Sequence, residues 1–494
     1  MKQRPNILFL MSDQHNASCM GAMGHPNVRT PSLDKVAQEG VLFTSAFANN
    51  PICSPSRICF MTGQYCHTHR ILGNNNFEND DTNPHTLGAQ LRRHGYQTAL
   101  IGKAHMIKKW DDDAFEHIRY CDLADTERVN PLSNHYYKHL VDNGLGDLYE
   151  DGALPKDHPY HKQRYATAQL PYEHSLEHWT GSETILFLEQ RDTRRPFFIH
   201  MSFERPHPNW MPSAEHVNLY NPDDLILPDN AFDWFENQFS GHCELIRTRA
   251  RHRARSEAEL KKILAHHFAL VTVIDMEIGR VLDWLRAHRE YENTVIVYTA
   301  DHGDFAGDHG IYDKNLGIFE SIHRIPFILK YPDGPRGRTC DEIIESVDLY
   351  RTLCDLADAP TPECVEGRSI LPIAAGEASG RDLAICEWNF PRPQSRVNAI
   401  RTRRYRLVYY DHEIGGELYD HETDPGETKD LWNDPAMRGV RMDLMEMLFD
   451  QINQYSLKSD YDMDAKKAER DRFTPSYLVH KKAKKWSDIE GLIS

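Results

Sequence analysis

Long apolar runs are missing from this chain. Hydrophobic residues make up 40% of its 494 residues, yet no run approaches the roughly 18 consecutive apolar residues that a membrane-spanning helix needs. The apolar run at residues 7–11 is too short for the hydrophobic region of a signal peptide and fits a β-strand better. We therefore expect no membrane segment. The chain as it stands is expected to be cytoplasmic, or periplasmic or secreted if a leader was removed.

Positive charge is also scarce. The chain has 57 Lys and Arg residues against 74 Asp and Glu residues, which gives a formal net charge of −17. This balance argues against non-specific nucleic-acid binding, so we expect no nucleic-acid partner. It does not exclude an anionic substrate, because a local cluster of basic side chains and a metal ion can outweigh the global charge.

A cysteine framework is missing as well. The ten cysteines are scattered and include no Cys-x-x-Cys pair. Such a distribution is typical of free thiols in a reducing compartment. Most of the ten should therefore act as small buried apolar residues.

Internal repeats and low-complexity linkers are absent too, and strand-like runs instead alternate with helical patterns. This alternation predicts an α/β fold in which helices cover both faces of a parallel or mixed sheet. Strands are expected at residues 6–12, 97–101, 197–203, 294–299 and 326–330, and helices at residues 30–40, 86–94, 182–190 and 260–289.

The pattern changes after about residue 375 to short strands and turns. We therefore place a catalytic domain at residues 1–375 and a smaller α+β subdomain with a C-terminal extension at residues 376–494. Two long polar stretches, residues 108–177 and 205–259, interrupt the first domain. Long insertions of this kind in α/β enzymes usually shape a substrate pocket.

Polar residues follow several of the expected strands. In open α/β sheets, ligands bind beyond the carboxyl ends of the strands. Two carboxylates, a carboxamide and an imidazole at neighbouring strand ends would suit a divalent cation. The residues are Asp13 and Gln14 after one strand, Asp301 and His302 after another, Lys103 and His105 after a third, and His207 after a fourth.

One segment resembles the signature of a known family. Residues 53–57 read Cys-Ser-Pro-Ser-Arg, and Thr62 and Gly63 follow. This segment is similar to the Cys-x-Pro-x-Arg signature of the formylglycine-dependent sulfatases of the alkaline phosphatase superfamily. The resemblance implies that a maturation enzyme oxidises Cys53 to formylglycine. It also implies an alkaline-phosphatase-like sandwich with a large mixed sheet flanked by helices.

The chemistry of a hydrated aldehyde explains the residue types of the signature. One of its hydroxyls can attack sulfur, and the other can later collapse to the aldehyde and expel sulfate. Pro55 fixes φ at the turn into a helix, and a helix that begins near Ser56 would point its N–H groups at the anion. Arg57 can hold the aldehyde hydrate and neutralise charge. His67 and His69 lie close by and are interpreted as helix residues or as residues behind the site.

Further segments resemble the same family. They are residues 95–105, which depart from the pattern at Ala104, and residues 205–208, 298–304 and 417–431. By this resemblance Lys103, His207 and Lys314 bind the sulfate, and His105 assists its release.

Two further assignments concern His207 and Asn74. His207 is also a candidate to protonate the leaving oxygen. Asn74 is a candidate for substrate binding, and Asn75 or Asn76 could serve equally well.

The resemblance also completes the metal site. One divalent cation would be held by Asp13, Gln14, Cys53, Asp301 and His302. The commoner family pattern has Asp at position 14 and Asn at position 302, and the Gln and His found here resemble the branch with phosphonate monoester hydrolases and some arylsulfatases. With one carboxylate fewer and one imidazole more, the set of ligands is softer than in the commoner pattern. We expect Ca²⁺ as the bound ion, and Mn²⁺ or Mg²⁺ also fit.

Together these features predict hydrolysis of an organic sulfate monoester. The nearest alternative is a phosphonate monoester or phosphodiester hydrolase with the same aldehyde, which Gln14 and His302 favour, whereas Lys103 and His105 favour a sulfatase. A non-catalytic anion- or glycan-binding protein would be marked by a lost nucleophile or ligand, and none is missing. Aryl, choline-like and carbohydrate sulfates all stay open. The charged C-terminal extension is compatible with a homo-oligomer.

Overall fold

The computed structural model describes residues 4–74, 85–121, 134–148, 165–233, 253–314, 317–391, 394–410 and 415–456. The chain falls into two compact units, Met1–Leu448 and Phe449–Ser494. Of the second unit, the structure describes only the end of helix α13 (Arg438–Ser456). The first unit contains both sheets and all of the candidate site residues.

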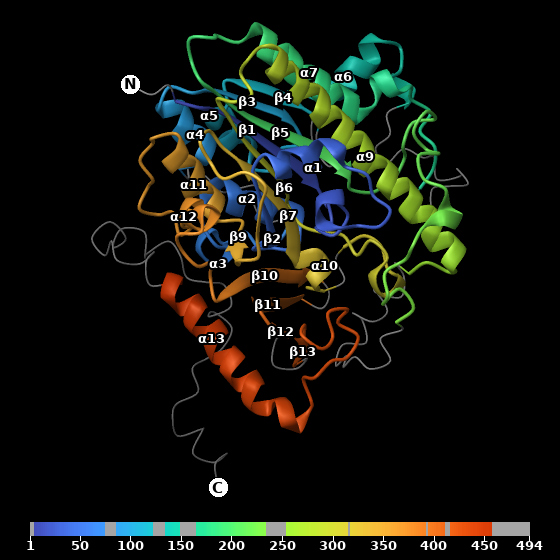
Figure 1. Ribbon diagram of the computed structural model, residues 1–494, viewed down its shortest axis with the longest axis vertical. Coiled ribbons are helices and arrows are strands. Elements are labelled where there is room, and N and C mark those ends of the chain that lie inside the picture. The colour runs from blue at the N-terminus through green and yellow to red at the C-terminus, as the bar shows by residue number, and fades with distance from the viewer. Residues whose placement is uncertain are drawn as a thin grey trace, which may run out of the picture. The chain divides into compact units, whose positions relative to one another are not determined.

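A nine-stranded mixed sheet forms the centre of the first unit (Figure 1). The order is β4-β3-β5-β1-β6-β7-β2-β8, and β9 pairs with β2. The inner strands β3, β5, β1 and β6 are parallel, whereas β7 runs antiparallel to both β6 and β2. The strands are β1 (Asn6–Asp13), β2 (Val41–Phe47), β3 (Gln97–Gly102), β4 (His117–Tyr120), β5 (Phe197–Pro206), β6 (Thr294–Ala300), β7 (Arg324–Lys330), β8 (Arg338–Cys340) and β9 (Ile344–Glu345).

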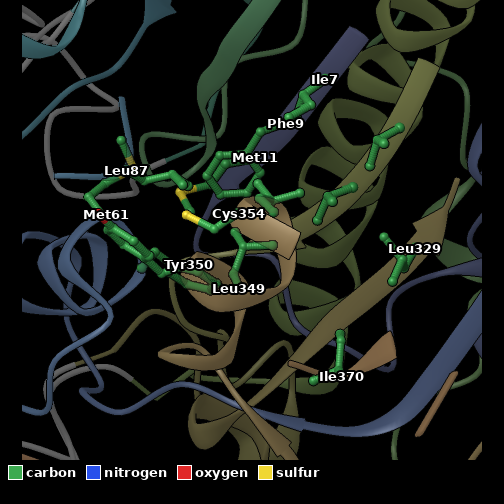
Figure 2. Close-up of a cluster of buried hydrophobic side chains, with 14 of the residues drawn as sticks. Ile7, Phe9, Met11, Met61, Leu87, Leu329, Leu349, Tyr350, Cys354 and Ile370 are labelled. Carbon is green, nitrogen blue, oxygen red and sulfur yellow. The ribbon is translucent and has the colours of Figure 1, made fainter. Parts of the chain in front are cut away.

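Helices cover both faces of this sheet, because successive side chains of a strand point to opposite sides. Leu8 and Leu10 of β1 pack with α1 (Pro31–Gln38), α7 (Leu176–Gln190) and α9 (Glu257–Ala287). The alternate residues of β1 pack on the other side with α2 (Cys53–Thr62), α4 (Leu87–Arg93) and α11 (Asp348–Leu356), as Figure 2 shows. The remaining α-helices described in this unit are α3 (Cys66–His69), α5 (Lys108–Ala114), α6 (His135–Asp142), α10 (Glu320–His323) and α12 (Leu371–Ala375).

A second, four-stranded antiparallel sheet follows in the order β10-β11-β12-β13. Its strands are β10 (Leu383–Pro391), β11 (Gln394–Thr402), β12 (Tyr405–Tyr409) and β13 (Gly416–Asp420). Ile52 packs into an apolar cluster with Trp388 and Val397 of this sheet. The small sheet therefore supports the residue that directly precedes the N-terminus of α2. The expected fold, a large mixed sheet between helices plus a smaller C-terminal subdomain, is confirmed.

Every strand and helix named from the sequence is present, with bounds that differ by a few residues. The helix expected at residues 182–190 begins already at Leu176, where the Ser175 hydroxyl caps it by accepting the N–H of His178. Residues 260–289 lie largely within the single long helix α9. Strand β2 was missed, because Thr44 and Ser45 interrupt its apolar pattern where its pairing with β7 shifts register.

The two long polar stretches are only partly within the described ranges, which include residues 108–121, 134–148, 165–177, 205–233 and 253–259 of them. Their expected role in shaping a substrate pocket stays a prediction. Within the described residues, no helix combines the length and the apolar character needed to cross a bilayer.

Candidate active site

Helix α2 presents Cys53 as its first residue. The helix was expected to begin near Ser56, but it begins three residues earlier, because Pro55 fits within the first turn of a helix. Asn74 caps this end: its side-chain oxygen accepts the backbone N–H of Ser54 at 3.1 Å. This contact places Asn74 beside the nucleophile position, whereas Asn75 and Asn76 lie outside the described residues.

Three charged or polar groups surround the sulfur of Cys53. Lys314 Nζ lies 2.8 Å from Sγ, His302 Nε2 lies 3.4 Å from it, and Asp13 Oδ1 lies 3.8 Å from it. All four side chains are buried. Burial and Asp13 raise the pKa of Cys53, but Lys314, Lys103 and His302 outweigh them, so that its pKa falls well below the usual value of a thiol. The position therefore favours an anionic atom.

Arg57 lies one turn further along α2 and ties the strand ends together. Its Nε donates to Asp301 Oδ2 at 2.8 Å, and one terminal nitrogen donates to Asp13 Oδ2 at 3.2 Å. The other terminal nitrogen donates to Ser202 Oγ at 2.8 Å and to the Lys103 carbonyl at 3.1 Å. The guanidinium is fully buried, so it fixes two carboxylates in a place where water cannot compensate their charge.

Lys103 forms a second bridge at the same edge of the sheet. Its Nζ lies 2.8 Å from Asp13 Oδ2 and 2.8 Å from Glu204 Oε1. Burial raises the pKa of Asp13, but the nearby charges of Lys103 and Lys314 lower it by more. The pKa of this carboxyl therefore lies well below its ordinary value. Sequence reasoning missed Glu204. The sequence feature that could have pointed to Glu204 is an acidic residue near the carboxyl end of a fully buried strand.

Asp13, Gln14, Asp301 and His302 converge as the predicted metal ligands. His302 Nε2 lies 3.7 Å from Asp301 Oδ1 and 3.9 Å from Asp13 Oδ1. The other ring nitrogen of His302 donates to the Gly303 carbonyl at 2.9 Å, so Nε2, which lies 3.2 Å from Lys314 Nζ, is the nitrogen that would bind a cation. Burial and Asp13 raise the pKa of Asp301, and a cation would relieve this repulsion between the two carboxylates.

Gln14 gives the clearest indication that a cation fits. Its side-chain nitrogen donates to Asp304 at 2.5 Å and to Asp313 at 3.0 Å. These bonds fix the orientation of the amide, and its oxygen is buried with no hydrogen-bond partner among the described atoms. Such an orphan acceptor is costly unless it binds something. Two carboxylates, an amide oxygen and an imidazole are a suitable donor set for a hard divalent cation.

The two predicted proton-transfer histidines follow strands β5 and β3. His207 Nδ1 donates to the Pro208 carbonyl at 2.6 Å, which leaves its Nε2 as an acceptor. Burial and Lys314 hold the pKa of His207 well below its usual value, so the ring is neutral until an anion binds nearby. His105 is half-buried in the loop after β3, at a positive φ of 48°.

Comparison with known protein families gives two matches. The model of the family Sulfatase matches residues 5–359, and the model described as N-sulphoglucosamine sulphohydrolase, C-terminal, matches residues 307–454. Among curated proteins, an N-acetylglucosamine-6-O-sulfatase of Bacteroides thetaiotaomicron is 28% identical, over 94% of this chain and 88% of that protein.

Two solved structures are similar over nearly the whole chain. One, determined in complex with its substrate D-glucosamine-2-N,6-O-disulfate, has a TM-score of 0.74 and 25% identity, and covers 94% of this chain and 99% of that chain. The other is a phosphonate monoester hydrolase of Agrobacterium radiobacter, with a TM-score of 0.76 and 22% identity. It covers 92% of this chain and 96% of its own, and at this identity it shows a shared fold.

Proposed function

The chain belongs to the sulfatase family, and from this premise we propose that it hydrolyses sulfate esters of sugars with a formylglycine made from Cys53 and one divalent cation. One observation supports the proposal most directly. The Cys53 sulfur, which stands where the oxygens of the modified residue would be, lies among Lys314, His302 and Asp13. A formylglycine-generating enzyme in the same cell would be the required partner.

The modified residue and the cation would supply distinct chemistry. The aldehyde hydrate would provide one hydroxyl that attacks sulfur and a second whose collapse releases sulfate. Asp13, Gln14, Asp301 and His302 would hold the cation, which would polarise the sulfate and favour the attacking alkoxide. Arg57 keeps the two carboxylates in position through its buried hydrogen bonds.

The remaining site residues would neutralise charge and transfer protons. Lys103 and Lys314 both lie within 4 Å of Asp13 and would neutralise the sulfate oxygens. His207 Nε2 can bind the sulfate, and once an anion raises its pKa the ring can protonate the leaving oxygen. His105, by its position after Lys103, would assist the release of sulfate.

The charge of the site suits an anion despite the acidic chain. Three carboxylates and three cations form one buried, ion-paired group, so these side chains balance; they are Asp13, Asp301, Glu204, Arg57, Lys103 and Lys314. A bound divalent cation would add two positive charges to this group. This local excess attracts a sulfate monoester even though the chain carries a net charge of −17.

A phosphonate monoester hydrolase with the same nucleophile is the second candidate. The amide and imidazole of Gln14 and His302 favour it, because they replace the commoner carboxylate and amide of sulfatases. Lys103 favours the sulfatase: it contacts Asp13 at 2.8 Å and adds a cation beside the reacting group.

The proposal is tested by comparing kcat/KM on four esters with the matured protein. They are a glucosamine 6-O-sulfate, an aryl sulfate, choline sulfate and an aryl phosphonate monoester. We expect kcat/KM on the sugar sulfate to exceed that on the phosphonate by about 100-fold or more, because a sulfatase site would bind the transition state of sulfate transfer more tightly. A preference for the phosphonate would overturn the sulfatase assignment. A preference for the aryl or choline ester would overturn only the assignment of sugar sulfates as the substrates.

Removal of the cation should inactivate the enzyme. After dialysis against a chelator, we expect kcat to fall by about 100-fold or more, and added Ca²⁺, Mn²⁺ or Mg²⁺ should restore it with the best metal identified by titration. In Asp301→Asn, restoration should require more metal, whereas Asp283→Asn, at a side chain that is 77% exposed, should behave like the wild type. Full activity in protein shown by elemental analysis to be metal-free would contradict the metal assignment.

A further inference from the structure

A second group of reactive side chains lies behind the nucleophile helix. Cys59, on α2, and Cys66, the first residue of α3, have their sulfur atoms 3.6 Å apart. His69, at the end of α3, places its Nε2 3.3 Å from the sulfur of Cys59. Both cysteines are completely buried, and His69 is half-buried. The sulfatase reaction uses none of these three residues.

The hydrogen bonds of His69 determine what its ring does to the sulfurs. The backbone N–H of Ile71 donates to His69 Nδ1 at 3.1 Å. A neutral imidazole that accepts at Nδ1 carries its proton on Nε2. The nitrogen that faces Cys59 is therefore a donor, and a donor beside two sulfurs in contact stabilises negative charge on the pair.

A second donor acts on the other sulfur. Asn50 Nδ2 lies 3.6 Å from the sulfur of Cys66. The side chain of Asn50 is held in this orientation, because it donates to the Glu387 carbonyl at 2.5 Å and accepts the Ile52 N–H at 3.0 Å. Each sulfur therefore has a polar donor beside it, and the two sulfurs lie in contact with each other.

From these contacts we propose that Cys59 and Cys66 are a redox pair that peroxide oxidises to an intramolecular disulfide. The proposal is independent of the sulfatase activity. It also changes the expectation that the buried cysteines serve only as small apolar residues, which is the reading that suits Cys354 in the main core.

The pKa values of the buried thiols agree with a difference between the reactive pair and the structural cysteine Cys354. Burial raises the pKa of Cys354 to about 12, and it raises the pKa of Cys59 well above its usual value. Burial also raises the pKa of Cys66, but the hydrogen bond from Cys59 and the proximity of His69 outweigh it and lower its pKa to about 6. The lowered pKa of Cys66 favours it as the attacking sulfur, with Cys59 as the resolving thiol.

The segment that carries Cys66 is held firmly against the rest of the fold. His67 donates its backbone N–H to Glu387 at 3.0 Å and pairs through its ring with the same carboxylate at 2.7 Å. Tyr65 donates its hydroxyl to Glu345 at 2.6 Å. Sulfurs kept in contact need to approach by only about 1.5 Å to reach the length of a disulfide bond.

A metal site is the competing use of the same three side chains. A zinc ion in a structural site takes four ligands, and a coordinating imidazole nitrogen must be unprotonated. Within the described residues this group offers three donor atoms, and the N–H of Ile71 places the ring proton on the nitrogen that faces the sulfurs. The arrangement therefore suits a thiol–thiolate pair better than a metal.

The oxidation balances with peroxide as the only co-reactant. The Cys66 thiolate attacks one peroxide oxygen, the O–O bond breaks, and the leaving hydroxide takes a proton from solvent. The Cys59 sulfur then attacks the resulting sulfenic acid, the S–S bond forms, and hydroxide leaves with the proton that Cys59 gives up. Two thiols and one H₂O₂ thus become one disulfide and two waters.

A single peptide reports the outcome. Both cysteines lie between Arg57 and Arg70 without an intervening Lys or Arg, so trypsin releases them together in residues 58–70. The purified full-length protein is reduced, treated with H₂O₂, denatured, alkylated and digested. We expect this peptide to be lighter than its reduced form by two hydrogen masses and to take up no alkylating reagent.

Variants assign the roles of the two sulfurs. In Cys59→Ser, Cys66 should stop at the sulfenic acid, which a dimedone-type probe would trap. In Cys354→Ala, a matched change at another buried thiol, the peptide should still become oxidised. Alkylation of both cysteines in peroxide-treated wild type would overturn the proposal. It would equally be overturned by stoichiometric zinc whose removal is needed before the two thiols react.

Discussion

Replacing Cys53 with alanine is expected to lower kcat/KM on the best sulfate ester by about 10⁴-fold or more. The residue at this position supplies the attacking group, and no other described side chain lies at the same point between Lys314 and His302. The variant should stay folded, because the change removes one buried atom and keeps the helix start. Activity and melting temperature, measured on the same preparation, separate loss of chemistry from loss of structure.

A serine at position 53 gives a sharper outcome than alanine. Its hydroxyl can attack sulfur, but the resulting sulfate ester has no second hydroxyl whose collapse would expel sulfate. We therefore expect Cys53→Ser to release at most one equivalent of the leaving alcohol and then stop. Steady turnover by this variant would contradict the formylglycine mechanism.

The control for both variants is Cys354→Ala, which removes a buried thiol from the main core (Figure 2) and should keep the wild-type activity. The mass of the tryptic peptide that spans residues 36–57 tests the modification itself. In active protein it should be lighter by the difference between a thiol and an aldehyde. An unmodified thiol in fully active protein would refute the modification.

Replacing Arg57 with alanine should destabilise the fold and inactivate the enzyme together. The guanidinium donates to Asp301 and Asp13 at 2.8 and 3.2 Å, and its removal leaves both carboxylates buried without this partner. Breaking a buried ion pair in this way costs about 3–5 kcal/mol. We expect a clear drop in melting temperature and a loss of about 100-fold or more in kcat/KM, because the carboxylates no longer hold their positions.

Added metal distinguishes the electrostatic explanation from a simple packing defect. A divalent cation compensates the same two carboxylates, so it should raise the melting temperature of Arg57→Ala by more than that of the wild type. Arg336→Ala is the matched control, because this arginine pairs with Glu292 while both side chains are more than 60% exposed, and exposed pairs contribute little. Equal metal-dependent shifts in Arg57→Ala and the wild type would contradict the explanation.

Regular apolar patterns made the central part of the fold predictable. The run at residues 6–12 and the run at residues 294–299 became the adjacent parallel strands β1 and β6, since a strand buried on both faces reads as an unbroken apolar run. Strand β2 was not predictable in this way. Its two central residues are polar, and the strand exists because β7 and β8 pair with it from distant parts of the chain.

The sequence likewise indicated some residues of the candidate site and not others. The sequence alone indicated the candidate nucleophile, the five candidate metal ligands and the candidate sulfate-binding lysines, because each belongs to or follows a short motif that resembles the family. It did not indicate Glu204 as the partner of Lys103, nor Asp304 and Asp313 as the residues that orient Gln14. These contacts join segments that are far apart in the chain, so no local spacing encodes them.

Taken by itself, the sequence determined which chemical groups this protein carries: a modifiable cysteine in a continuous signature, and carboxylates, an amide and imidazoles where strands end. The tertiary structure decided how those groups are oriented and charged. The side-chain oxygen of Gln14 is buried without a hydrogen-bond partner among the described atoms, because two carboxylates accept from the nitrogen of the same amide. Cys59 and Cys66 act as a pair because α2 and α3 hold their sulfurs 3.6 Å apart. Proton positions and pKa values follow from burial and from neighbours in space, which only the folded chain brings together.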